Sequence, residues 1–91
     1  MTVVLELPPE FQKYADGQAT VELEGQTVNA VLDELCLRFP DLDARVRRRP
    51  DEAYPYLPIF LNGKKLPLQG LSQIEVNDGD RLEVFALASG G

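Results

Sequence analysis

The stretch from 27 to 40, TVNAVLDELCLRFP, decides the fold of this chain. Thr27 is suited to be a helix N-cap, because its hydroxyl can accept a hydrogen bond from a backbone N–H of the first turn. Pro40 ends the helix, since it disfavours helical geometry at the residue before it. Between them the apolar side chains recur at helical spacing and form one stripe: Val28, Val31, Leu32, Leu35 and Phe39. The pattern predicts one amphipathic helix with a single face to bury.

Two strands are expected before this helix. Residues 2–7 combine apolar and β-branched side chains and end at a pair of prolines. Residues 19–24 alternate, with Val21 and Leu23 facing inward and polar side chains facing outward, as a half-buried strand does. The connection between the two strands, 8–18, has room for one helical turn.

Further strands are expected after the helix. Residues 57–61 form the next strand, and Asn62-Gly63 is the strongest hairpin signal in the chain. Pro67 confines the returning strand to a sheet edge, because proline cannot donate to the ladder. The last strand is expected at 81–87, after an Asn-Asp-Gly-Asp turn. Residues 1–87 are thus predicted to form one α+β domain: a mixed sheet of four to five strands, with the first and last adjacent in its middle and the main helix packed on one face.

Alternation along the strands leaves aromatic side chains on the sheet face that the helix does not cover. If the even-numbered side chains of the last strand face the core, Phe85 and Leu87 lie on the open face. By the same alternation Phe60 points outward from its strand. Large aromatic groups on an open sheet face suggest a binding patch. The alternative is that the connection 8–18 folds over them.

The composition excludes several classes of function. The 91 residues are 44% hydrophobic and 26% charged, as expected of one globular domain. The absence of histidine removes the usual general base, the commonest transition-metal ligand and every Ser-His or Cys-His pair. The net charge of −6 argues against nucleic acids and acidic membranes as partners. The single cysteine, with neither a signal-peptide pattern nor a membrane-spanning run, indicates a cytoplasmic protein.

Other polar features are interpreted as structural. The basic run 45–49, RVRRR, is expected to be a solvated turn or short helix, although it could also meet an acidic partner groove. Cys36, beside the apolar stripe, is expected to be a small semi-buried apolar residue without a redox role. Asp78 and Asp80 are expected to form a turn, and no metal site or catalytic site is predicted.

The chain ends Ala88-Ser89-Gly90-Gly91, and 88–91 is predicted to be a flexible tail. This ending, after this order of elements, resembles ubiquitin and more closely the bacterial and archaeal sulfur carriers of the MoaD/ThiS family. The resemblance covers essentially all 91 residues and implies the ubiquitin-like β-grasp fold. The segments that carry it are Gly25-Gln26-Thr27-Val28, Leu61-Asn62-Gly63-Lys64, Asp78-Gly79-Asp80-Arg81-Leu82 and Ser89-Gly90-Gly91.

The resemblance also implies a chemistry at the chain's end. In the family an E1-like enzyme of the MoeB or ThiF type uses ATP to convert the last carboxylate to an acyl-adenylate, and sulfur then displaces AMP. The resulting thiocarboxylate is handed to a sulfur-accepting enzyme. Here Gly91 would be the modified residue, and Ser89 and Gly90 would be the arm threaded into the partner, because glycine fits a narrow channel. The chain would be a carrier that binds no cofactor, with ATP and any zinc belonging to its partner.

The resemblance implies that the patch of Phe60, Phe85 and Leu87 is the surface that the activating enzyme grips. The receiving pathway is open between cysteine and molybdopterin biosynthesis. Ala86-Leu87-Ala88 stands where molybdopterin-synthase small subunits often carry a Pro-Pro pair, which favours a CysO-like carrier. The alternatives are a molybdopterin-synthase small subunit, a protein modifier conjugated to lysines through Gly91, and a ubiquitin-like interaction module without tail chemistry.

Overall fold

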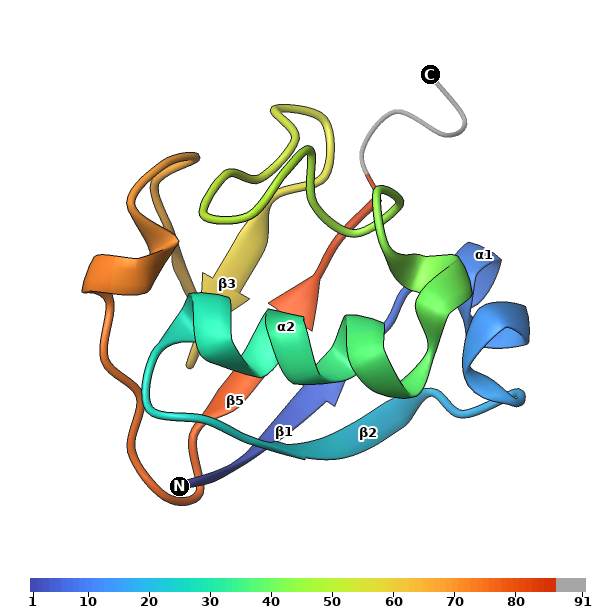
Figure 1. Cartoon of the computed structure of the whole chain (residues 1–91), viewed down its shortest axis with the longest axis horizontal. Helices are drawn as coiled ribbons and strands as arrows, with labels where there is room; N and C mark the ends of the chain where they lie inside the picture. Colours follow the sequence, from blue (N-terminus) through green and yellow to red (C-terminus); the bar gives the residue numbers. More distant parts are fainter. Residues whose placement is uncertain (87–91) are drawn as a thin grey trace.

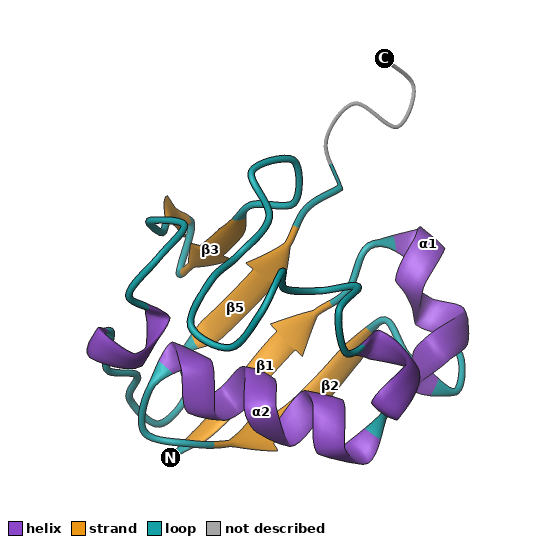
Figure 2. Ribbon diagram, turned by 45° about the horizontal axis from the view of Figure 1, so that its top comes forward, coloured by secondary structure: helices purple, strands orange, loops and turns teal. Residues whose placement is uncertain are grey.

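The computed structural model describes residues 1–86, in which one helix crosses one face of a five-stranded sheet (Figures 1 and 2). Its elements are β1 (Thr2–Glu6), α1 (Pro9–Gln12), β2 (Thr20–Glu24), α2 (Val28–Arg38), β3 (Ile59–Leu61), β4 (Lys64–Lys65) and β5 (Arg81–Val84), with 3-10 turns at Lys13–Ala15, Pro40–Leu42 and Leu71–Gln73. The strand order is β2-β1-β5-β3-β4. The central pair β1 and β5 is parallel, and the other pairs are antiparallel. The predicted mixed sheet, with the first and last strands adjacent in its middle, is confirmed.

The helix α2 has the boundaries that the sequence predicts. The Thr27 hydroxyl accepts a hydrogen bond from the Ala30 N–H at 3.1 Å, and the helix stops at Arg38, two residues before Pro40. All five members of the predicted apolar stripe are buried. They pack on the buried inward side chains of the strands, and the burial of Val21, Leu23, Leu82 and Val84 confirms the predicted alternation. The other inward side chains are Val3, Leu5 and Ile59. None of the helices in residues 1–86 is long and apolar enough to cross a bilayer.

The approach of β2 to α2 requires a glycine at position 25. A Cβ atom on Gly25 would lie 2.8 Å from the backbone nitrogen of Val31 and 2.9 Å from its Cγ2. Real Cβ atoms essentially never come this close to other atoms. The glycine therefore allows the strand to turn directly into the helix above the sheet.

The hairpin and the last strand are shorter than predicted. Asn62 and Gly63 have φ values of 51° and 84°, so they form the expected tight turn, and β4 is an edge strand. The strand β3 begins only at Ile59, because Pro58 has no N–H for the ladder. The strand β5 ends at Val84, after which the Phe85 N–H donates to the Pro58 carbonyl at 3.1 Å. The last part of the predicted strand, Leu87, and the predicted tail 88–91 lie outside the described residues.

The prediction of a solvated basic run is wrong for Arg47. Its side chain is buried, donating to the side-chain amide oxygen Oδ1 of Asn29 at 2.9 Å and pairing with the Asp33 carboxylate at 2.7 Å. The reason is the neighbouring Val46, which is fully buried in the core and draws the next residue against α2. The side chains of Arg48 and Arg49 are exposed, as predicted, and lie 3.8 Å and 3.4 Å from carboxylate oxygens of Glu52.

Candidate partner-binding face

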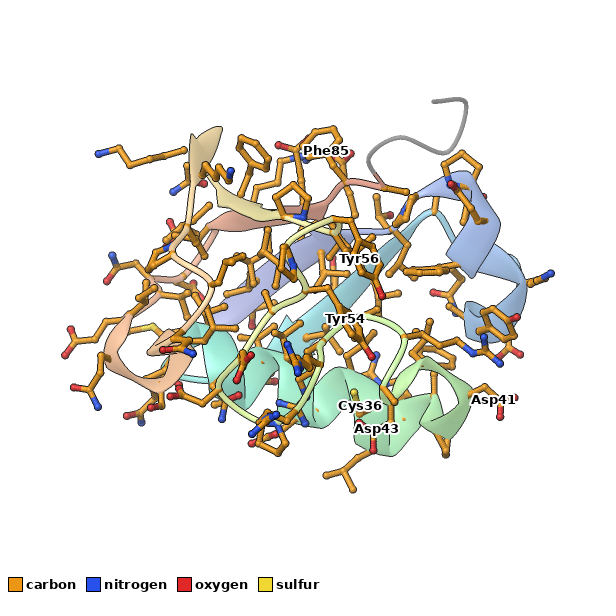
Figure 3. The ribbon with its side chains drawn as sticks, turned by 90° about the horizontal axis from the view of Figure 1, so that it is seen from above. Cys36, Asp41, Asp43, Tyr54, Tyr56 and Phe85 are labelled. Carbon is orange, nitrogen blue, oxygen red and sulfur yellow. The ribbon has the colours of Figure 1, made fainter. Side chains whose placement is uncertain are left out.

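The sheet face opposite α2 carries the predicted aromatic pair. Phe60 on β3 and Phe85 just after β5 meet edge to face, with ring centroids 4.9 Å apart and ring planes at 85°. Phe85 is 43% exposed, and Phe60 is half-buried. Figure 3 shows Phe85 on the side of the sheet away from α2, whereas Cys36 lies on that helix and Asp43 close to it. The predicted placement of both rings on the open face is confirmed.

The connection 8–18 does not cover these rings. Its aromatic side chains, Phe11 and Tyr14, pack against the core. Its two prolines instead line one side of a shallow hollow beside Phe85. Of the two alternatives, the one in which the connection 8–18 leaves the rings uncovered is therefore correct for the described residues. The aromatic pair is available to a partner.

Hydrogen bonds fix the hairpin that presents Phe60 against the strand that presents Phe85. The Asn62 side chain accepts from the Arg81 N–H at 2.9 Å and donates to the Asp80 carboxylate at 3.1 Å. Asp80 also accepts from the Asn77 N–H at 2.7 Å, so it closes the preceding turn. The bond from Asn77 and then that from Asn62 lower the pKa of the Asp80 carboxyl below its usual value. These contacts confirm Asp80 as a turn former and make the aromatic pair a rigid feature.

Charged side chains surround the rings on the same face. Glu83 lies on β5 between Phe60 on β3 and Glu6 on β1, which are its ladder neighbours. The Arg81 guanidinium pairs with the Glu6 carboxylate. Alternation alone puts Glu83 on this face, and the sequence predicts that β1 and β5 are neighbours, but not the register that places the Glu6 carboxylate beside it.

A hollow of about 410 Å³ opens directly at the aromatic pair. Its surface is mainly apolar, and it is lined by Phe60, Gly63, Glu83, Phe85 and Ala86. The strand β5 ends at Val84, so the chain has already left the sheet where Ala86 lines this hollow. The predicted site residues Leu87, Ser89, Gly90 and Gly91 lie outside the described residues, and their roles stay predictions.

The cysteine does not contribute a nucleophile. The Cys36 side chain is only 9% exposed, which confirms it as a semi-buried apolar residue. Burial raises the pKa of its thiol from 9.0 to about 11, with Asp43 adding to the shift and Arg47 opposing it. Thiolates rather than thiols attack and bind metals, so the burial of this thiol and its raised pKa both disfavour a reactive role. Across residues 1–86, no three His, Cys, Asp or Glu side chains are grouped so that they could hold a metal ion.

Comparisons with known proteins agree with the fold and extend to the C-terminal residues of the chain. The model of the ThiS family matches residues 6–91. The sulfur carrier protein CysO of Mycobacterium tuberculosis is 23% identical over 93 residues, covering all of both chains. The structure of CysO in the Amycolatopsis orientalis BexX/CysO complex superimposes with a TM-score of 0.83 at 24% identity, covering 98% of this chain and 99% of that one. The structure of small archaeal modifier protein 1 of Haloferax volcanii superimposes with a TM-score of 0.78 at 26% identity. The match covers 96% of this chain and 98% of that one.

Proposed function

Because the chain belongs to the ThiS family and is a sulfur carrier protein of that family, we propose that Gly91 is the residue on which it carries sulfur. The observation that supports this most directly is that the family match runs through residue 91, so that the terminal Gly-Gly is part of it. A sulfur carrier is a substrate of other enzymes rather than a catalyst. This role fits a chain without histidine.

The chemistry requires activation because a carboxylate is a poor acyl donor. An activating enzyme would join the Gly91 carboxylate to the AMP part of ATP and release pyrophosphate, which converts the carboxylate oxygen into part of a good leaving group. Hydrosulfide would then attack the carbonyl carbon, the C–O bond to AMP would break, and a proton would be released. The product is a C-terminal thiocarboxylate, whose sulfur a downstream enzyme accepts.

The residues of the chain position its C-terminus in the partner and do not themselves catalyse the reaction. Gly90 and Gly91 lack Cβ atoms, so they suit a narrow active-site channel, with Ser89 completing the arm. The face of Phe60 and Phe85 would hold the partner while the arm is inserted, and Leu87 would extend this face. We propose that the partner is an E1-like enzyme of the MoeB or ThiF type, that ATP is bound only by that partner, and that the final acceptor belongs to cysteine or molybdopterin biosynthesis.

Adenylation provides the first test. With the activating enzyme and ATP, the full chain is expected to support exchange of labelled pyrophosphate into ATP. The matched control ends at Ser89, since removing the last two residues leaves the described fold intact. Equal exchange with both chains would contradict the proposal that Gly91 is the activated residue.

Conjugation to proteins is the second candidate, and its support is the likeness to small archaeal modifier protein 1. Both functions share adenylation and differ in the acceptor. A carrier is expected to end as a free thiocarboxylate, whereas a modifier forms amide bonds to lysines. Immunoblots of cell extracts containing the tagged chain, resolved under denaturing and reducing conditions, distinguish the two, because only amide-linked products survive as higher bands.

A further inference from the structure

Glu83 is placed at the centre of the aromatic face. Its ladder neighbour on one side is Phe60, and Phe85 lies two residues later, just past the end of β5. Glu83 is half-buried and lines both hollows that open beside the aromatic pair. Any partner that covers the two rings must also cover this carboxylate.

Within residues 1–86 this carboxylate has no ion pair and no hydrogen bond from a side chain. Its neighbour on the other side is Glu6 on β1, and the nearby guanidinium of Arg81 is already paired with Glu6. Two carboxylates on adjacent strands, which lie about 4.8 Å apart, repel each other. Lys65 stands in the same ladder row but beyond Phe60, and it forms no ion pair with Glu83. The face therefore keeps one uncompensated negative charge beside the two aromatic rings.

This charge makes the face selective. A purely apolar partner surface would remove water from the Glu83 carboxylate without providing a hydrogen bond or an ion pair, and this desolvation is strongly unfavourable. A partner that brings a cation to this point would compensate the charge in a dry environment, where charge-assisted hydrogen bonds are strong. Arginine fits best, because its guanidinium can bind a carboxylate through two hydrogen bonds and also lie against an aromatic ring.

We propose that Glu83 is a specificity residue of this face, and that it selects partner proteins with an arginine set in an apolar docking surface. The inference rests on the proposed function, because the partner in question is the enzyme that activates Gly91. It adds to that function the chemistry by which the chain recognises its partner. The aromatic rings supply contact area, and Glu83 decides which apolar surfaces are accepted.

The test compares two neutral, isosteric variants. Glu83→Gln is expected to weaken binding to the activating enzyme about tenfold or more, and to reduce the dependence of affinity on salt. Glu22→Gln is the matched control, because Glu22 points from β2 to the same face and carries the same charge, but lies away from the rings. It is expected to change the dissociation constant less than about twofold.

Charge reversal provides a second readout. Glu83→Lys is expected to lose binding, and replacing the partner's arginine by glutamate is expected to restore it. Circular dichroism checks that each variant is folded. If the wild-type chain is adenylated and Glu83→Gln binds as Glu22→Gln does, the inference is wrong while the proposed function stands. If the wild-type chain is neither bound nor adenylated, both are wrong.

Discussion

Phe85→Ala should separate docking from folding, because the ring is large, exposed and next to the end of the sheet. A phenylalanine side chain presents roughly 200 Å². Since Phe85 is 43% exposed, about 85 Å² of it is available to a partner. At about 25 cal/mol per Å², covering this area contributes about 2 kcal/mol. The variant is therefore expected to weaken binding to the activating enzyme about thirtyfold.

The assay is a titration of the enzyme with labelled chain at one fixed salt concentration. Leu37→Ala is the matched control, because Leu37 is 82% exposed but lies on α2, away from the aromatic face. It is expected to change the dissociation constant less than about twofold. The lost contact with Phe60 costs about 0.5–1.5 kcal/mol of stability, so folding must be checked at the assay temperature. An unchanged affinity for Phe85→Ala, or an equal loss with Leu37→Ala, would refute the assignment of this face.

Three further predictions concern the scaffold. Arg47→Ala is expected to lower the free energy of unfolding by about 2–3 kcal/mol in urea titrations. Arg47→Met is expected to lower it by only about 1 kcal/mol, because Met keeps the buried aliphatic part of the side chain. Equal losses would mean that the charge of Arg47 contributes more to stability than its buried aliphatic part. Gly25→Ala is expected to destabilise the chain by about 1–3 kcal/mol, because its Cβ would collide with Val31, and an unchanged melting temperature would contradict that close approach. Burial raises the pKa of the Cys36 thiol to about 11, so the stability that its protonated form contributes is present below pH 9.0 and lost as pH rises through about 11. Cys36→Ala should flatten that loss in denaturation measured across this range, and an unaltered pH profile would show that the thiol is not buried in solution.

The elements with strong local signals could be predicted from the sequence. The N-cap, the apolar stripe and the proline after it define α2 because helices depend on near neighbours. The Asn62-Gly63 turn set the register of the hairpin for the same reason. Strict alternation then placed Phe60 and Phe85 on the open face, which is the part of the candidate site that the sequence predicted correctly.

Contacts between distant segments could not be predicted in this way. A run of basic residues does not show which member is buried, and Arg47 is buried because Val46 enters the core and Asn29 and Asp33 of α2 lie opposite. The adjacency of Glu6 and Glu83 depends on the register between the first and last strands, whereas the sequence predicted only that these strands are neighbours. Both features arise from tertiary structure, which local patterns do not encode.

The most direct test of the central claim is the intact mass of the chain after incubation with the activating enzyme, ATP and sulfide. We predict a mass gain equal to the replacement of one oxygen by sulfur. Fragmentation should place it on Gly91, and it should be absent without ATP. An unchanged mass of a folded chain that nevertheless binds the enzyme, or a gain on any other residue, would contradict the account.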